Sequence, residues 1–208
     1  SMNNKFVFIY GITPFVTMRC LEQININLCA MKSNVSIISI GSGLIYSSDG
    51  PTHHGTQELA IMSALPNLSI YTASDPFSSD QLPKIAYKNK GPNLLRIEKG
   101  SLSEIYFEDE KFNDDINTII DSQDISILAT GITTQMAVDI SNELKKENIQ
   151  VGVIDILRFK PLNEKKIINS IKGCKKVITL EENIPAGGIA SSISEIIVSN
   201  NLNCKLAK

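Results

Sequence analysis

Residues 35–54 read VSIISIGSGLIYSSDGPTHH, an apolar run that leads directly into a polar segment with three glycines. The near-continuous apolar run 35–40 is typical of a parallel strand that is covered on both faces. The segment after it carries Asp49 and both histidines of the chain, His53 and His54. Because ligands bind at the carboxyl ends of the strands in open α/β sheets, this order predicts a functional loop at a sheet edge.

The dipeptide Gly50-Pro51 predicts a rigid turn within this loop, because proline fixes its own φ and glycine accepts almost any. Asp49 and His53 flank the turn and are therefore candidate site residues, as rigid polar loops often carry function. A solvated surface turn with two unengaged imidazoles is the alternative that these residues alone leave open.

Length and composition bound the fold and exclude several functions. The 208 residues, 42% of them hydrophobic, fit two α/β domains, because domains commonly have ~100–150 residues. The net charge of −2 gives no basic field to attract nucleic acid or an anionic membrane. The four cysteines lack a CxxC pair, which favours reduced thiols in a cytoplasmic protein over a disulfide framework or a zinc site. Nothing resembles a signal peptide or a membrane span, and Ser1-Met2 has the form of a cloning remnant.

Around the opening stretch, the pattern predicts strands alternating with helices. The strands are expected at 6–10, 35–40, 68–72 and 92–97, and the helices at 15–31, 56–65 and 80–88. In the helix at 15–31, apolar residues recur every three or four positions and define one buried face. This strand and helix order indicates an α/β domain.

A second unit of the same kind follows an acidic connecting segment at 101–124, which has room for one short strand. Its strands are expected at 125–130, 151–156 and 176–180, and its helices at 134–148, 160–171 and, after Gly187-Gly188, 189–197. Gly131 and Gly187-Gly188 lack the spacing of nucleotide-binding glycines and are interpreted as tight turns. The predicted fold is therefore two three-layer α/β/α domains with mainly parallel sheets, at residues 3–110 and 122–208.

Several linked motifs resemble the transketolase family of thiamine diphosphate enzymes. Residues 6–100 resemble the pyrimidine-binding domain of that family, and residues 125–200 are similar to its C-terminal domain. The resemblance depends on Ser48-Asp49-Gly50-Pro51-Thr52-His53-His54, Leu59-Ala60-Ile61-Met62, Leu65-Pro66-Asn67, Ser74-Asp75, Phe15, Arg19, Glu22-Gln23-Ile24, Lys160-Pro161-Leu162, Glu181-Glu182 and Gly187-Gly188. These motifs occur in the family's order along almost the whole chain.

The resemblance implies an enzyme that transfers a two-carbon ketol unit between sugar phosphates, such as pentose phosphates, with thiamine diphosphate as cofactor. It makes His53 and Asp49 the candidate catalytic residues, with both in contact with the substrate hydroxyls and His53 responsible for acid–base chemistry. It assigns Phe15 to an aromatic wall against the aminopyrimidine ring and places Arg19 in the cofactor-binding region. Lys99 stands where the family usually has an arginine that binds the sugar phosphate, so it keeps the charge but not the bidentate geometry.

Departures from the family pattern lead us to expect an incomplete enzyme. The catalytic glutamate of the family lies upstream of the segment where this chain starts, and the diphosphate-binding domain with its Mg²⁺ ligands has no counterpart in the sequence. Gly41, Ile12 and Ser63 replace a histidine, an aromatic residue and an arginine of the family. We therefore expect a chain truncated at both ends that is inactive alone, forms a homodimer and works with a diphosphate-binding domain on another chain or segment.

Three alternatives remain open at this stage. Two are enzymes, a deoxyxylulose-phosphate synthase and the β subunit of a 2-oxoacid dehydrogenase, and the run Pro51-Thr52-His53-His54 is closer to transketolases than to either. The third is a non-catalytic module that dimerises or binds sugars. The missing glutamate favours this module, whereas the retention of Asp49, His53 and Arg19 favours the enzyme.

Overall fold

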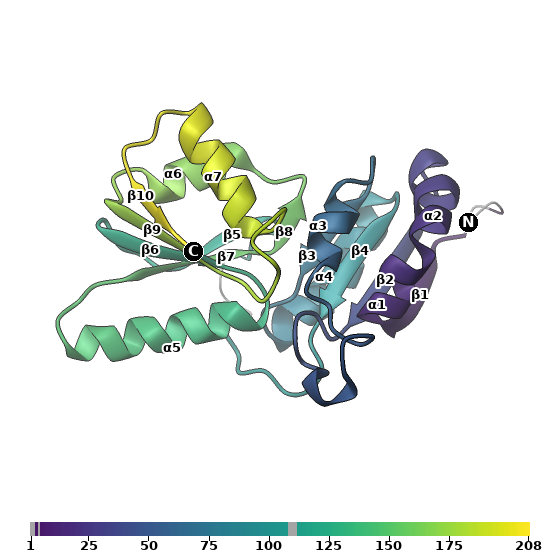
Figure 1. Ribbon diagram of the computed structural model, residues 1–208, viewed down its shortest axis with the longest axis horizontal. Helices are drawn as coiled ribbons and strands as arrows, with labels where there is room; N and C mark the ends of the chain where they lie inside the picture. Colours follow the sequence, from purple (N-terminus) through teal and green to yellow (C-terminus); the bar gives the residue numbers. More distant parts are fainter. Residues whose placement is uncertain (1–2, 4, 108–111) are drawn as a thin grey trace.

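The computed structural model describes residue 3 and residues 5–107 and 112–208, which form two five-stranded sheets side by side (Figure 1). The strands are β1 Val7–Ile12, β2 Val35–Ile40, β3 Ser69–Thr72, β4 Asn93–Ile97, β5 Ile116–Ile120, β6 Ile125–Ala129, β7 Gly152–Ile156, β8 Arg158–Lys160, β9 Lys176–Leu180 and β10 Lys205–Ala207. The main helices are α3 Glu58–Ser63, α4 Pro76–Asn89, α5 Ile132–Lys146, α6 Glu164–Ile171 and α7 Ile189–Ser199.

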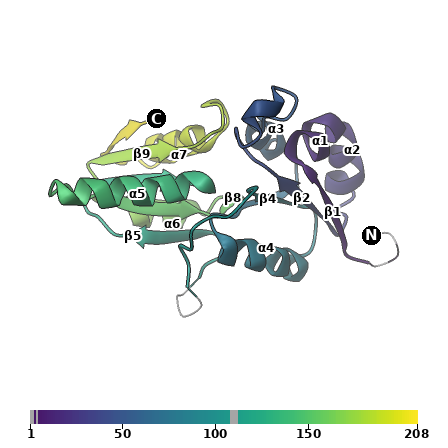
Figure 2. The same ribbon diagram turned by 90° about the horizontal axis from the view of Figure 1, so that it is seen from below.

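The first sheet has the order β1-β2-β4-β3-β8, with β1 to β4 parallel and β8 antiparallel to β3. Its central strands are buried on both faces, as the apolar run of β2 predicts. Leu59 and Met62 of α3 pack with Ile37 and Leu94 on one face. Helix α4 covers the other face, and Figure 2 shows it on the side of the sheet opposite α1 to α3.

The second sheet has the order β10-β9-β6-β7-β5, and only its edge strand β5 is antiparallel to its neighbour, β7. Helices α6 and α7 pack on one face through Ile167 and Ile193, in the same apolar cluster that includes the core of the first sheet. Ala137 of α5 packs on the other face. The predicted class, two three-layer α/β units with mainly parallel sheets, is confirmed.

A buried carboxylate connects the two units. Asp155, on β7, accepts hydrogen bonds from the hydroxyls of Ser74 and Thr134, both at 2.7 Å, and of Tyr106 at 2.5 Å. Asp75 is the N-cap of α4, and its carboxylate accepts hydrogen bonds from the backbone amides of Ser78, Ile105 and Tyr106. These bonds fix the connection after β3 against the second sheet.

The helix predicted at 15–31 is the largest error in the first unit. The chain instead forms α1 Thr13–Val16, the 3₁₀ turn η1 Met18–Cys20, α2 Leu21–Gln23 and the π-helix η2 Ile24–Ala30. The break falls at Thr17, whose backbone leaves the helical region and whose hydroxyl donates to the Thr13 carbonyl at 2.5 Å. Such bonds from a threonine hydroxyl to the carbonyl four residues earlier compete with regular helix geometry. Met31, expected on the buried face, is 52% exposed.

Three smaller differences concern helix starts and short strands. Helix α4 begins at Pro76 rather than near residue 80, because Asp75 and Ser78 form a capping box. The segment at 158–160 is a strand, β8, that crosses to the first sheet, and α6 starts only at Glu164 with Asn163 as its cap. The strand β10 was not predicted.

The limits of the predicted domains remain predictions. The expected end of the first unit at residue 110, like Ser1-Met2, lies outside the described residues. The short strand for which the connecting segment has room is present as β5. In the described ranges, none of the helices combines the length and apolar character needed to cross a membrane.

Candidate active site

A closed loop between β2 and α3 carries the polar motif. Its two ends meet at Gly43 and Gly55, which exchange two backbone hydrogen bonds of 2.8 Å. Gly43 has a φ of +59°, and a Cβ atom there would lie 2.3 Å from Oε2 of Glu182. Glycine at this position therefore permits both the backbone turn and the close approach of Glu182. The pairing holds residues 44–54 at the carboxyl edge of the first sheet, as predicted.

His53 lies half-buried in this loop with one ring nitrogen engaged. Its backbone amide donates to the Gly50 carbonyl at 3.0 Å, which closes the predicted turn. Its Nδ1 lies 3.0 Å from the hydroxyl of Thr52, whereas Nε2 has no hydrogen-bond partner among the described residues. Nε2 is therefore the nitrogen available to a ligand. His54 points to the loop backbone, with Nε2 at 3.3 Å from the Ser47 carbonyl oxygen.

Aromatic and cationic side chains from three segments surround His53. The Phe15 ring, from α1, meets the imidazole edge to face at 4.9 Å between centroids. The Arg19 guanidinium carbon lies 4.0 Å from the centre of the Phe15 ring. The centroid of the Tyr46 ring lies 6.2 Å from that of His53, and Nζ of Lys99 lies 4.6 Å from the centre of the Tyr46 ring. Four of the five predicted site residues are thus connected, with Tyr46 as a link that the sequence did not indicate.

Asp49, the fifth predicted residue, is exposed at the end of the 3₁₀ turn η3 Ser47–Asp49. Its backbone amide donates to the Tyr46 carbonyl at 3.0 Å. Within the parts of the chain that the structure describes, its carboxylate makes no hydrogen bond or ion pair. The structure therefore places Asp49 on the same loop as His53, with no hydrogen bond or ion pair between the two among the described residues.

Buried charges that the sequence reasoning missed lie beneath the loop. Arg96, in β4, and Glu58, at the start of α3, form an ion pair at 2.8 Å and are 2% and 0% exposed. Arg96 also donates to the Thr72 hydroxyl at 2.8 Å. The available signal was an arginine inside a strand otherwise buried on both faces, where a charge requires a partner.

Glu98 is another buried acid of this cluster. Burial raises its pKa to about 7; Arg96 opposes the rise, and the carboxylates of Glu182 and Glu58 add to it. One oxygen of Glu58 and one of Glu98 have no hydrogen-bond partner among the described residues. Beside the loop, Arg96 is therefore surrounded by the carboxylates of Glu58, Glu98 and Glu182.

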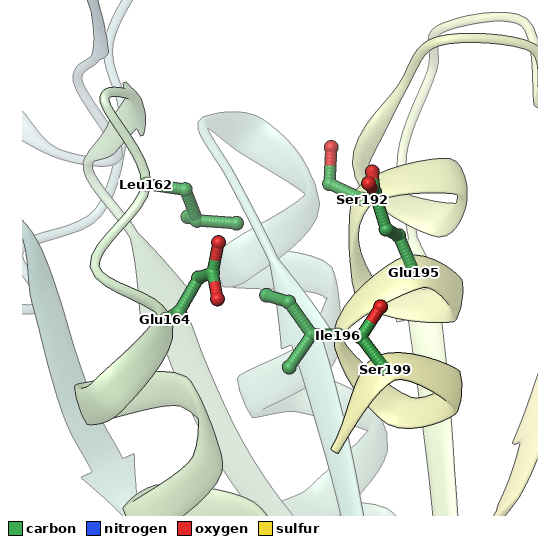
Figure 3. A pocket seen from close by; sticks show the side chains of 6 residues that line it. All are labelled: Leu162, Glu164, Ser192, Glu195, Ile196 and Ser199. Atoms are coloured by element: carbon green, nitrogen blue, oxygen red, sulfur yellow. The ribbon is translucent and has the colours of Figure 1, made fainter. Parts of the chain in front are cut away.

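A separate hollow of about 210 Å³ lies between α6 and α7. Figure 3 shows Leu162 and Glu164 on one side of it and Ser192 and Glu195 on the other. None of the predicted site residues lines this hollow. Among the described residues, no group of three or more His, Cys, Asp or Glu side chains is arranged to hold a metal ion.

Comparison with known proteins assigns the chain to a family. Residues 1–104 match the model of the transketolase pyrimidine binding domain, and residues 115–207 match that of the transketolase C-terminal domain. The chain belongs to the transketolase family. The predicted resemblance is thereby confirmed for both parts of the sequence.

Relatives within the transketolase family include separate subunits. The chain is 28% identical to one of the subunits of the apulose-4-phosphate transketolase of Actinobacillus succinogenes, over 96% of this chain and 65% of that protein. It is also 28% identical to a putative transketolase C-terminal section of Methanocaldococcus jannaschii, over 100% of this chain and 66% of that protein. The chain thus spans just under two thirds of these transketolase relatives.

A solved structure agrees with this relation. The structure described as "split gene transketolase, inactive beta4 tetramer" superposes with a TM-score of 0.89 at 26% identity, over 100% of this chain and 67% of that chain. The chain therefore shares its fold with a chain of that split-gene transketolase.

Proposed function

We propose that this chain is the pyrimidine-binding and C-terminal part of a thiamine diphosphate-dependent transketolase that transfers a two-carbon ketol unit between sugar phosphates. The observation that carries the proposal is the group of Phe15, Arg19 and His53 at the carboxyl edge of the first sheet. The relatives that are a single subunit or a C-terminal section of a transketolase support it.

In this proposal His53 transfers protons and Asp49 binds the sugar hydroxyls. The Thr52 hydroxyl engages Nδ1 of His53 and fixes the orientation of the ring, which leaves Nε2 to face the substrate. The exposed carboxylate of Asp49 accepts no hydrogen bond from the described residues, and Lys99 supplies a positive charge for the sugar phosphate. Because a lysine lacks the planar fork of an arginine, it acts on the phosphate as a point charge.

The residues around Phe15 fit the pyrimidine end of the cofactor. Phe15 lines a mostly apolar hollow of about 260 Å³, together with Ile9, Val16, Ile24, Leu28 and Ile37. Apolar walls with an aromatic face suit a flat heteroaromatic ring. When bound, thiamine diphosphate supplies the electron sink for breaking a carbon–carbon bond next to a carbonyl. The diphosphate and Mg²⁺ belong, in this proposal, to a diphosphate-binding domain on another chain or segment.

The proposal includes the setting in which the protein acts. The partners are sugar phosphates, the diphosphate-binding domain and a second copy of the chain, and neither nucleic acid nor a membrane is included. We place the protein in the cytoplasm, in agreement with its four free cysteines, because disulfides are rare in that reducing compartment.

Titration calorimetry with thiamine diphosphate and Mg²⁺ tests the proposal. We expect heat of binding when the chain is mixed with the diphosphate-binding part from the same source, and none with the chain alone. Phe15→Ala should weaken binding by about tenfold through loss of aromatic contact, whereas Tyr87→Ala, an exposed aromatic residue on α4, should not. Equal affinity of the Phe15→Ala mixture and the unaltered mixture would contradict the cofactor assignment.

A further inference from the structure

The segment that follows β9 extends from the second unit toward the candidate site. Glu181 fixes this segment against its own unit, because its carboxylate accepts hydrogen bonds from the amides of Ile189 and Ala190, both at 2.8 Å. These amides belong to the first turn of α7, where a helix has unpaired donors and favours a negative charge. The start of the segment is therefore held rigidly by its own helix.

The next residue, Glu182, contacts the loop of the first unit. Its Oε1 accepts a hydrogen bond from the backbone amide of Leu44 at 3.4 Å. Its side chain lies so close to Gly43 that a Cβ atom there would approach Oε2 to 2.3 Å. Two residues later, the amide of Ile184 donates to the Thr56 carbonyl at 2.8 Å. The segment thus contacts the loop at its start, around Gly43 and Leu44, and just after Gly55, on both sides of the part that carries Asp49 and His53.

Glu182 makes these contacts in surroundings that disfavour its charge. Burial raises its pKa, and the carboxylate of Glu58 adds to the rise, while the Leu44 amide and Arg96 oppose it. The carboxylate of Glu98 is a further charge near it, since Glu182 contributes to raising the pKa of Glu98. A carboxylate that is kept half-buried beside two other acids is costly unless the contacts that it makes compensate for it.

We propose that Glu182 is a positioning residue that holds the loop 43–56 in place from the second unit, so that Asp49 and His53 are presented at the sheet edge. The Gly43–Gly55 pair closes the loop upon itself, whereas Glu182 and the Ile184 amide fix the closed loop relative to the other sheet. Through this contact the C-terminal unit contributes to the site without touching substrate. The consequence for catalysis rests on the function proposed above; the hold on the loop does not.

Amide hydrogen exchange followed by mass spectrometry tests the hold on the loop directly. In Glu182→Ala, exchange of the amides at 44–56 should be about tenfold faster, because loss of an acceptor with charge lowers the free energy of local opening. Glu182→Asp should also accelerate exchange, because its shorter side chain moves the carboxylate away from the Leu44 amide. This variant replaces Glu182→Ala in the test if the alanine variant does not fold. Glu182→Gln retains an acceptor oxygen and should exchange nearly as the unaltered chain does. Glu195→Ala, which removes a carboxylate on α7 away from the loop, is the matched control and should leave exchange at 44–56 unchanged.

Unchanged exchange at 44–56 in both Glu182→Ala and Glu182→Asp would overturn the proposal. Turnover of the assembled enzyme separates it from the proposed function. Faster exchange together with a lower kcat in Glu182→Ala, with both restored in Glu182→Gln, supports the positioning role of Glu182 and the proposed function. Faster exchange with unaltered kcat and KM supports the hold on the loop and contradicts the catalytic use of that loop.

Discussion

His53 is held by contacts that orient its ring rather than by core packing. Its ring meets Phe15 and Tyr46 at the edge of the first sheet, and its Nδ1 meets the Thr52 hydroxyl. In the assembled enzyme, His53→Ala should lower turnover by about 10²–10⁴-fold, the usual contribution of a positioned acid or base. The loss of stability should stay below about 1 kcal/mol, as for most substitutions outside packed or buried polar sites.

Steady-state turnover and a urea midpoint for the same variant measure both quantities. His54→Ala is the control, because the only hydrogen bond of its ring among the described residues is with the Ser47 carbonyl, and its turnover should fall by less. A His53→Ala enzyme with near-native turnover would remove the acid–base assignment. A loss of several kcal/mol with unaltered turnover would make His53 a structural anchor.

Arg96 and Glu58 form a buried ion pair whose partners depend on each other. Arg96→Met leaves the carboxylate of Glu58 buried beside Glu98 without its cation, so unfolding should become easier by about 3–5 kcal/mol. The double variant Glu58→Met/Arg96→Met removes both charges. Its free energy of unfolding should therefore fall by less than that of Arg96→Met alone. Urea unfolding of the single and double variants and the unaltered chain measures the coupling, and additive losses would show that the pair is not coupled.

Asp155 connects β7 to the segments after β3 and β4 through the hydroxyls of Ser74 and Tyr106, and to α5 through that of Thr134. Burial raises its pKa from 3.8 to about 6, although the hydrogen bonds from Tyr106, Thr134 and Ser74 oppose the rise. A raised pKa means that the fold favours the protonated form. The stability that this contributes is therefore complete below about pH 4 and is lost as the pH rises through about 6.

Asp155→Asn isolates this contribution, since an amide has a similar shape and does not titrate. The unfolding free energy of the unaltered chain minus that of Asp155→Asn should fall between about pH 4 and pH 6 and then level off. Urea titrations at several pH values give this difference, in which the separate titration of Glu98 cancels. If this difference in unfolding free energy grew with pH, it would contradict a raised pKa for Asp155.

The elements that the sequence predicted best are those whose signal is local and strong. The apolar runs of β2 and β9 gave the strands at their observed positions, because buried parallel strands need continuous apolar residues. The prediction of one unbroken helix across Thr17 was wrong, since an apolar period does not show whether a hydroxyl will bond back to the chain. β8 was missed because its pairing with the other sheet depends on tertiary contacts.

The candidate site shows the same division between local and long-range information. The loop, its turn at Gly50 and the edge of the sheet on which it lies followed from the residues. The ring of Tyr46 and the contacts of Glu182 with Gly43 and Leu44 did not, because they join segments that are distant in the sequence or depend on side-chain direction.

For the whole molecule we expect self-association. The edge strand β1 presents Phe8, Ile9 and Tyr10 to solvent, with exposed fractions of 44%, 40% and 72%. Exposed apolar patches mark interaction sites, and two-fold contacts are the commonest arrangement of identical chains. Sedimentation at micromolar concentration should therefore give at least twice the mass of one chain. Tyr10→Lys should lower that mass, whereas Val198→Lys, an exposed position on α7, should not; a single-chain mass for the unaltered protein would contradict the expectation.

We propose that this chain supplies one part of an active site that is completed elsewhere. Ketol transfer from xylulose 5-phosphate to ribose 5-phosphate, with thiamine diphosphate and Mg²⁺ present, tests this proposal. The assay compares the chain alone, the diphosphate-binding part alone and their mixture. We expect turnover in the mixture and none in either part. Turnover by the chain alone, or a mixture that forms a complex and stays inactive toward these and other sugar phosphates, would contradict it.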